Sequence, residues 1–367
     1  MIPHSSKING PLVLFLVHSA QIGIGVLGFQ RIIAKYAGFD AWITVILTGI
    51  LTHFFMFLIF VILNKSGEDD IYGVHEFIAG KYAAKVLNII WIIYLFGASL
   101  TILRSFLEVI QVWMFPKVPV WSLALVFILI TFYIIDGGFK VVAGMAFFGV
   151  IIPFFLILML FFPAEYADFR SMLPIMRRPP ADIIFGIKDA ALTFFGFEFI
   201  LIYYPFLKNR EKSWKWAHAG LFLSTAIYLL ITVVSFGFYT EEQLSKTTWA
   251  TLTMFKIIEM PFVERFEYIG ISFWVIVVIP NITLSLWAAT RLAKLTFKVR
   301  QRQLLILFTA ALFIGTIHFE NRDQINFLND NYSRMGLYLI SIYIPILVLA
   351  VFIKSSWRKK KVRGGAA

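Results

Sequence analysis

The sequence predicts an all-α integral membrane protein with about ten transmembrane helices, and two observations carry this prediction. The first is composition: 60% of the 367 residues are hydrophobic, only 15% are charged, and phenylalanine occurs 40 times. A protein that folds in water is usually about half apolar. The second is the spacing of the apolar residues, which form runs long enough to cross a bilayer at about 20 residues each. The bilayer is therefore the solvent in which this chain folds.

Ten apolar runs are the expected spanning helices. The fifth follows the tight turn Asp136-Gly137-Gly138 and contains Pro153, which should kink it. The first is too long for the apolar core of a signal peptide, and no small-residue cleavage site follows it, so we expect it to remain in the mature protein. In chain order the runs lie at residues 11–36, 41–63, 84–113, 119–135, 138–162, 183–206, 214–238, 266–290, 303–319 and 333–353.

The basic residues predict that both termini are cytoplasmic. Most of the 33 lysines and arginines fall in loops that are inside the cell if the N-terminus is inside, where such residues are enriched. An even number of spans returns the C-terminus to the same side. Arg31 and Lys35 are exceptions, because they fall at the outer end of the first helix. The basic tail at 354–367 should contact anionic lipid headgroups, so the net charge of +12 requires no nucleic acid partner.

The predicted outer loops are longer than the inner ones. The loop at 239–265 contains an amphipathic piece, TTWATLTMFKIIEM, which we expect to lie on the membrane surface. Arg104 and Glu108 are spaced i,i+4 and are expected to pair near the outer interface. Cysteine is absent, which excludes disulfides and thiol catalysis. The histidines show no metal-ligand spacing, and no nucleophile–base set or phosphate loop is present. We therefore expect no enzyme, no metal site and no cofactor.

The stretch QIGIGVLG in the first run allows two interpretations. Gly23, Gly25 and Gly28 have the G-x-G-x-x-G spacing of a dinucleotide-binding turn. That turn needs a strand before it and an acidic residue about 20 positions later. Here the glycines lie inside an apolar run, and a bilayer does not accommodate an open parallel sheet. The sequence favours the alternative, a helix that breaks inside the membrane, as in transporters whose two inverted repeats each begin with a discontinuous helix.

The broken-helix hypothesis requires a second break in the sixth run. The segment DAALTFFGFEFILIYYPFL, residues 189–207, has Gly196 near its middle and Glu198 two residues later. A carboxylate near the bilayer centre costs about 2.5–3.5 kcal/mol, so it normally faces protein or water. Glycine alone would be weak support, because it also serves close helix packing. The expected organisation is a single transmembrane domain over residues 1–367, with five-helix repeats at 11–162 and 183–353.

Three pieces of the sequence resemble a known family. They are SAQIGIGVLGFQR in the first run, LTFFGFEFILIYYP in the sixth and FVERFEYIG before the eighth. With the ten spans, they resemble the B subunit of spore germinant receptors, a family of the amino acid–polyamine–organocation superfamily, which has the LeuT-type fold. The E-R-F-E at Glu264 to Glu267 is the more specific mark, because the other two motifs are general to the superfamily. Gln30 departs from the family pattern, since many relatives have proline there.

The resemblance implies a LeuT-type 5+5 inverted repeat, with helices 1 and 6 broken, and a function in nutrient sensing. The family acts in the inner membrane of the dormant spore. Its B subunit works with an A-type subunit, which has membrane and soluble parts, and with a C-type subunit, which is a lipoprotein. Germinants are small nutrients: amino acids, sugars or nucleosides. The implied partners are therefore a small nutrient germinant, the A-type and C-type subunits and the lipid bilayer.

The paired breaks are the expected ligand site, because an unwound helix exposes backbone groups that would otherwise be paired. The N–H groups from Gly23 to Val26 suit a ligand carboxylate. The carbonyls that end the preceding half-helix, and those around Phe194 and Phe195, suit an ammonium group, so a zwitterionic amino acid fits both. Tyr94, in the third helix, is expected to close the pocket. The candidate ligand-binding residues are Ser19, Gln21, Gly23, Ile24, Gly25, Val26, Tyr94, Phe194, Phe195, Gly196, Glu198 and Asn281.

Structural alternatives stand beside each of these assignments. The glycines also suit a packing groove, and the polar residues also suit helix–helix hydrogen bonds. Glu198 could pair with a cation, relay a proton, contact the ligand, or pin the unwound segment through a structural hydrogen bond. For the whole chain the first hypothesis is a receptor subunit that binds a nutrient and signals through partners. The second is a proton-coupled amino acid or amine transporter, and the third is a structural scaffold for the A subunit.

Overall fold

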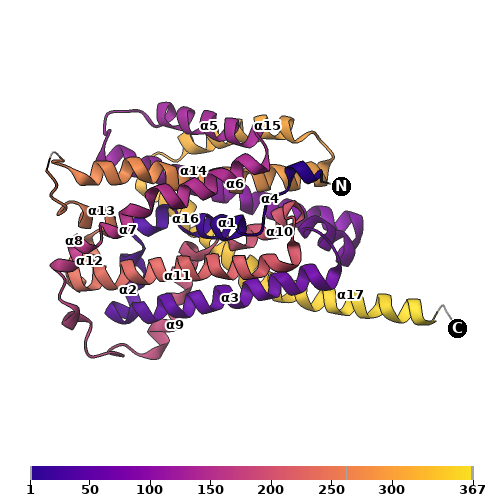
Figure 1. Ribbon diagram of the computed structural model, residues 1–367, viewed down its shortest axis with the longest axis horizontal. Coiled ribbons are helices and arrows are strands. Elements are labelled where there is room, and N and C mark those ends of the chain that lie inside the picture. The colour runs from indigo at the N-terminus through magenta and orange to yellow at the C-terminus, as the bar shows by residue number, and fades with distance from the viewer. Residues whose placement is uncertain (1, 262, 365–367) are drawn as a thin grey trace.

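The computed structural model describes residues 2–261 and 263–364, which form a bundle of long helices (Figure 1). The helices in chain order are α1 (Leu12–Gln21), α2 (Phe29–Ala37), α3 (Ala41–Ser66), α4 (Ile71–Trp113), α5 (Val120–Asp136), α6 (Phe139–Ile151), α7 (Phe155–Leu158), α8 (Phe161–Glu165), α9 (Pro180–Phe194), α10 (Ile200–Tyr203), α11 (Ser213–Phe238), α12 (Glu241–Lys246), α13 (Ala250–Phe255), α14 (Phe266–Phe297), α15 (Gln301–His318), α16 (Arg322–Leu337) and α17 (Ile344–Gly364).

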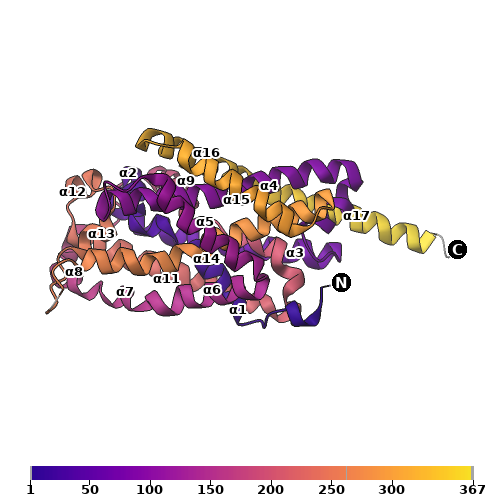
Figure 2. The same cartoon turned by 90° about the horizontal axis from the view of Figure 1, so that it is seen from above.

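Both ends of the chain lie at the same end of the bundle, and α8, α12 and α13 lie at the opposite end (Figure 1). From above, α17 extends beyond the body on the side where the N-terminus lies (Figure 2). Six helical stretches in the described residues are long and apolar enough to cross a membrane, and shorter apolar helices lie between them. The protein is thus a multi-pass membrane protein whose described ends share one side.

Each of the ten predicted runs is helical in the structure. The first and sixth are divided, as predicted, and the fifth bends at Pro153, where α6 passes through a short 3₁₀ turn into α7. Two helices begin earlier than predicted. The helix α4 begins at Ile71, behind the N-cap Asp70, and kinks at Gly80, whose φ is +73°. The helix α16 begins at Arg322, behind a capping box, and continues through a π turn into α17.

The helix α14 is at the centre of the bundle. It packs along α4 and against α6 and α15, and most of its side chains are buried. A helix that is apolar on every side belongs inside the protein. The helix α1 packs against α11 and α6, whereas α5 and α15 lie side by side along one edge (Figure 1). This arrangement surrounds the first broken helix with α6, α11 and α14.

Two predictions about the outer side are wrong. The amphipathic piece does not lie on a surface, because all but one of the residues of α13 are buried and the helix packs against α14 and α11. Arg104 does not pair with Glu108. It donates from Nε to the Phe319 carbonyl (2.5 Å) and from Nη2 to the Glu320 carbonyl (3.0 Å). Both carbonyls lie directly after α15, where backbone carbonyls have no partner within the helix, so this end of α15 attracts the guanidinium. Glu108 pairs instead with Arg322 (2.5 Å).

Candidate functional site

The first helix is discontinuous at the predicted glycines. The helix α1 ends at Gln21, Ile22 is extended, and Gly23 has φ −145° and ψ −142°. A single 3₁₀ turn, Ile24–Leu27, then leads into α2. The break therefore separates two half-helices by a segment whose backbone does not follow the α-helical ladder.

The sixth predicted helix, residues 183–206, breaks where α9 ends. Phe195 is extended, and Gly196 follows with φ +111° and ψ −23°, a conformation that residues with a Cβ rarely adopt. A Cβ at Gly196 would also lie 2.6 Å from the Ala20 carbonyl oxygen. A Cβ at Gly25 would lie 2.9 Å from Cγ2 of Thr193, on α9. Glycines thus allow the two broken helices to approach each other closely from both sides.

A cavity of about 890 Å³ lies at the two breaks. Its lining includes residues of both discontinuities, as well as Glu241 of α12 and Arg322 at the start of α16. Because α12 lies at the end of the bundle away from both termini, the cavity extends toward that end (Figure 1). If the termini are cytoplasmic, this is the outer side.

Seven of the twelve candidate residues line this cavity: Gln21, Gly23, Ile24, Gly25, Phe195, Gly196 and Asn281. The other five do not line it: Ser19, Val26, Tyr94, Phe194 and Glu198. All five are buried, so they lie behind the wall rather than on it. Sequence position near a glycine does not reveal which way a side chain points, because the helix direction changes at the break.

Glu198 pins the break of the sixth helix. Its carboxylate accepts the Gly196 N–H through Oε2 (2.9 Å) and Oε1 (3.1 Å), and Oε1 accepts the Tyr94 hydroxyl (2.6 Å). Tyr94 stacks on Tyr332, with ring centroids 5.2 Å apart, and Tyr332 lines the cavity. Tyr94 of α4 and Glu198 therefore support the cavity wall from behind, through Tyr332 of α16.

Side chains from neighbouring helices donate hydrogen bonds to the carbonyls of the first break. The Tyr228 hydroxyl donates to the Gln21 carbonyl (2.8 Å), and Nδ2 of Asn281 donates to the Ile22 carbonyl (3.1 Å). Nε1 of Trp274 donates to the Gly23 carbonyl (3.2 Å). Carbonyls of the sixth helix are occupied as well, since those of Thr193 and Phe194 accept from Tyr228 (3.0 Å) and from Nε2 of Gln21 (2.8 Å).

The first break leaves N–H groups without partners in the turn, whereas its carbonyls accept hydrogen bonds from side chains. The turn Ile24–Leu27 begins directly after Gly23, and the first N–H groups of such a turn have no acceptor within it. Ile24 and Gly25 line the cavity, so this positive end of a helical segment faces the space at the breaks. The arrangement favours a negatively charged or hydrogen-bond-accepting group on the ligand.

The aromatic and charged residues of the cavity wall were not among the predicted site residues. Tyr228 and Tyr332 line the cavity, as do Arg31, Lys35 and Asp189. The tyrosines gave no signal in the sequence, because one tyrosine in an apolar helix is common. Arg31 and Lys35 did give one: they break the expected distribution of positive charge, and the structure places them on the cavity wall.

Gln30, which departs from the family's proline, holds the second half of the first helix. It is fully buried, and its Nε2 donates to Oγ1 of Thr251 (2.7 Å) and Oγ of Ser235 (3.2 Å). Oγ1 of Thr251 in turn donates to the Val26 carbonyl (2.7 Å). The side chain therefore links α2 to α13 and α11, a contact that proline would not make.

The arrangement of the helices and their two breaks defines the class of protein. A substrate-bound, outward-open Na⁺-coupled sialic acid symporter superposes with a TM-score of 0.61, over 96% of this chain and 77% of its own, at 11% identity. MhsT, in complex with L-phenylalanine, superposes with a TM-score of 0.62, over 94% of this chain and 98% of its own, at 14% identity. At these identities the likeness shows the fold alone. The protein has the LeuT-type fold that permease-like membrane proteins share.

The family then follows from sequence similarity. A family model described as "Spore germination protein" matches residues 7–325. Spore germination protein GerQB of Bacillus cereus is 38% identical over 98% of this chain and 99% of its own length. Spore germination protein YndE of Bacillus subtilis (strain 168) is 22% identical, also over 98% of this chain and 99% of its own. The chain belongs to the spore germination protein family, as the three motifs indicated.

Proposed function

We propose that this chain is the B-type membrane subunit of a spore germinant receptor, which binds a small nutrient at the paired breaks and triggers germination. The cavity of about 890 Å³ is large enough for an amino acid, and the half-helix end that faces it suits a carboxylate. The chain works with A-type and C-type subunits in the inner spore membrane. Its termini are cytoplasmic, and its two five-helix repeats occupy residues 11–162 and 183–353.

One observation favours a function in nutrient sensing over transport coupled to a bound cation. In transporters of this kind, unwound carbonyls coordinate the coupling ion. Here the carbonyls of Gln21, Ile22 and Gly23 already accept hydrogen bonds from protein side chains. An ion would have to displace or share those donors, whereas a nutrient carboxylate would meet N–H groups that the turn leaves without partners. The site therefore favours binding of an anionic group without a coupled cation.

The experiment is a binding screen on the purified protein. Thermal stability is measured with a panel of amino acids, sugars and nucleosides, and the best ligand is then titrated into Tyr228→Phe. We expect an amino acid to stabilise the wild type. Tyr228→Phe removes the hydroxyl that connects the Gln21 and Thr193 carbonyls across the two breaks, so the cavity loses a fixed contact in its wall. Binding should weaken about tenfold, the effect of a change near 1.4 kcal/mol. Tyr133→Phe, on an exposed side chain of α5, is the control. The proposal fails if none of the panel binds, or if the two variants bind equally.

The E-R-F-E segment is the proposed contact for a partner subunit. Nε of Arg265 pairs with Glu267 (2.9 Å), and its guanidinium lies 4.0 Å from the Tyr268 ring centroid. Arg265 and Glu264 are exposed at the outer end of α14. We expect Glu264→Ala or Arg265→Ala to reduce recovery of the receptor complex more than nutrient binding. A tenfold loss of binding, on the order of 1.4 kcal/mol, with normal complex recovery would contradict this.

Proton-coupled transport of an amino acid or amine is the second candidate, because Glu198 is a fully buried carboxylate beside the break. Uptake into liposomes decides between the two functions. A receptor should show no accumulation of the nutrient under any pH gradient. Accumulation by the wild type that disappears in Glu198→Gln would make this protein a transporter.

A further inference from the structure

A second cavity, of about 920 Å³, lies at the end of the bundle that holds both termini. Ile2, Pro3, Ser6 and Lys7 of the N-terminal segment form one part of its wall, and the last turns of α5 and α14 and the first turn of α15 form another. The rest comes from the loop before α4, from the start of α6 at Gly138 and Phe139, and from the end of the sixth predicted helix at Pro205 together with Arg210. It shares no lining residue with the cavity at the breaks.

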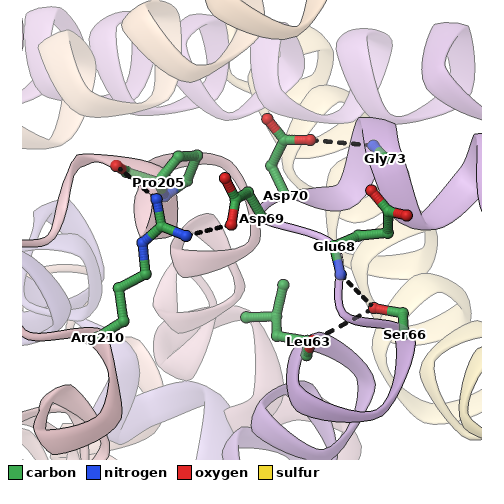
Figure 3. A network of polar contacts seen from close by, with 8 residues as sticks. All are labelled: Leu63, Ser66, Glu68, Asp69, Asp70, Gly73, Pro205 and Arg210. Atoms are coloured by element: carbon green, nitrogen blue, oxygen red, sulfur yellow. Dashed lines mark hydrogen bonds and ion pairs between the residues drawn. The ribbon is translucent and has the colours of Figure 1, made fainter. Parts of the chain in front are cut away.

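Charged side chains line this inner cavity, with basic residues in excess. The basic residues are Lys7, Arg210, Arg291, Lys294 and Arg302, and the acidic residues are Asp69, Asp70 and Asp136. Two of the cations already have partners. Arg210 pairs with Asp69 and donates to the Pro205 carbonyl (3.2 Å), as Figure 3 shows. Arg302 pairs with Asp136 (3.1 Å).

Three cations of the cavity, Lys7, Arg291 and Lys294, form no ion pair within residues 2–261 and 263–364. All three are partly buried. Nε of Arg291 is buried and has no hydrogen-bond partner in that part of the chain, and its guanidinium lies 5.2 Å from the Phe206 ring centroid. Buried charge without a partner is costly, so the site favours the arrival of an anion.

One acid of the cavity, Asp70, remains beside these three cations. Asp70 caps α4, and one of its carboxylate oxygens accepts the Gly73 N–H (3.0 Å; Figure 3). Burial raises the pKa of Asp70, although the Gly73 hydrogen bond and Arg291 act in the opposite direction. The local balance of Lys7, Arg291 and Lys294 against Asp70 is therefore positive.

We propose that the inner cavity binds a phosphate group, held by Arg291, Lys294 and Lys7. A guanidinium presents two parallel N–H groups that match phosphate oxygens, and lysines add point charge. The cavity lies at the level where helices end, so the phosphate group belongs either to an anionic phospholipid of the inner leaflet or to a free phosphate compound. Basic pockets between helices on the cytoplasmic side are known to take lipid headgroups.

The test uses the full-length protein and the variant Arg291→Gln/Lys294→Gln. The control is Lys208→Gln/Lys212→Gln, which removes two charges at exposed positions that do not line the cavity. One arm measures retention of phosphatidylglycerol, against phosphatidylcholine, by native mass spectrometry. The other measures the shift in unfolding temperature with inorganic phosphate in detergent. Lys294→Gln alone is included in both arms, because this side chain is partly exposed and its loss should leave the fold intact.

We expect the wild type and the control variant to retain phosphatidylglycerol, and the cavity variant to lose about fivefold in affinity for each charge removed. A specific effect with phosphatidylglycerol alone assigns the site to a lipid, and an effect with inorganic phosphate assigns it to a free phosphate compound. The proposal is overturned if neither probe binds the wild type, or if the cavity and control variants lose binding equally.

Discussion

The two broken helices reach the same discontinuity by different means. The first break is held from outside, because its carbonyls accept from Tyr228 on α11 and from Trp274 and Asn281 on α14. The sixth break is held partly by its own chain, because Glu198 returns to the Gly196 N–H two residues earlier. Tyr94, Tyr228 and Gln21 hold it from other helices. The first break thus depends on donors from other helices, whereas the sixth also depends on a carboxylate of its own segment.

The largest effect should come from Gly196→Ala. At φ +111° an alanine is strained by about 1–3 kcal/mol, and its Cβ would also meet the Ala20 carbonyl. We expect a marked drop in accumulation and in unfolding temperature. Gly144→Ala is the matched control, since a Cβ there meets no atom within 4 Å. If Gly196→Ala accumulates and unfolds like the wild type, the sixth break is not fixed by its own backbone.

Gly25→Ala should act on the first break without removing the fold. Its φ is outside the left-handed region, so the cost is only the contact with Cγ2 of Thr193 at 2.9 Å. Overpacking of this kind costs about 1–3 kcal/mol, enough for a loss of about tenfold or more in nutrient affinity. Adding Thr193→Ser removes the contacting methyl and should restore part of the response, measured as a germination dose–response. A normal response in Gly25→Ala would show that the two breaks can separate freely.

Glu198→Gln tests whether the carboxylate holds the sixth break. An amide replaces one acceptor oxygen by a donor, so the Gly196 N–H and the Tyr94 hydroxyl cannot both keep their present partners. We expect a loss of stability of about 1–3 kcal/mol. The threshold for the nutrient response should shift as well. Glu165→Gln, at an exposed position of α8, is the control. Equal unfolding temperatures for the two variants would show that Glu198 does not hold the sixth break in place.

The smallest effect should come from Trp274→Phe. It removes one neutral hydrogen bond to the Gly23 carbonyl, worth about 0.5–1.5 kcal/mol, and leaves the other donors of the first break in place. The unfolding temperature should fall slightly more than in Trp121→Phe, whose ring is exposed on α5. A loss as large as that of Gly196→Ala would mean that the first break depends on one donor instead of several.

Much of the fold could be predicted from the residues alone. The ten apolar runs, the two breaks and the kink at Pro153 follow from local properties: run length, glycine position and the missing N–H of proline. The buried position of α13 could not be predicted. Its amphipathic pattern fits a membrane surface and a protein surface equally, and only the packing against α14 and α11 decides between them.

The candidate site was predicted in part. Residues of the breaks that line the cavity could be found because glycine and a buried carboxylate mark a break. Tyr94 and Glu198 were expected at the pocket, but they bond to each other behind its wall. The expectation that break carbonyls are open to an ammonium group did not consider Tyr228, Trp274 and Asn281, which come from helices far away in sequence.

The order of residues was enough to predict that this protein crosses a membrane and where two of its helices break, because those properties depend on neighbouring residues along the chain. Which groups at the breaks remain available depends on how distant helices pack. Whether a carbonyl is free depends on donors such as Tyr228, which lies 207 positions after Gln21 and reaches it only when α1 and α11 pack together. Hydrogen bonding in a bilayer must be satisfied within the protein, so packing determines what is left for a ligand.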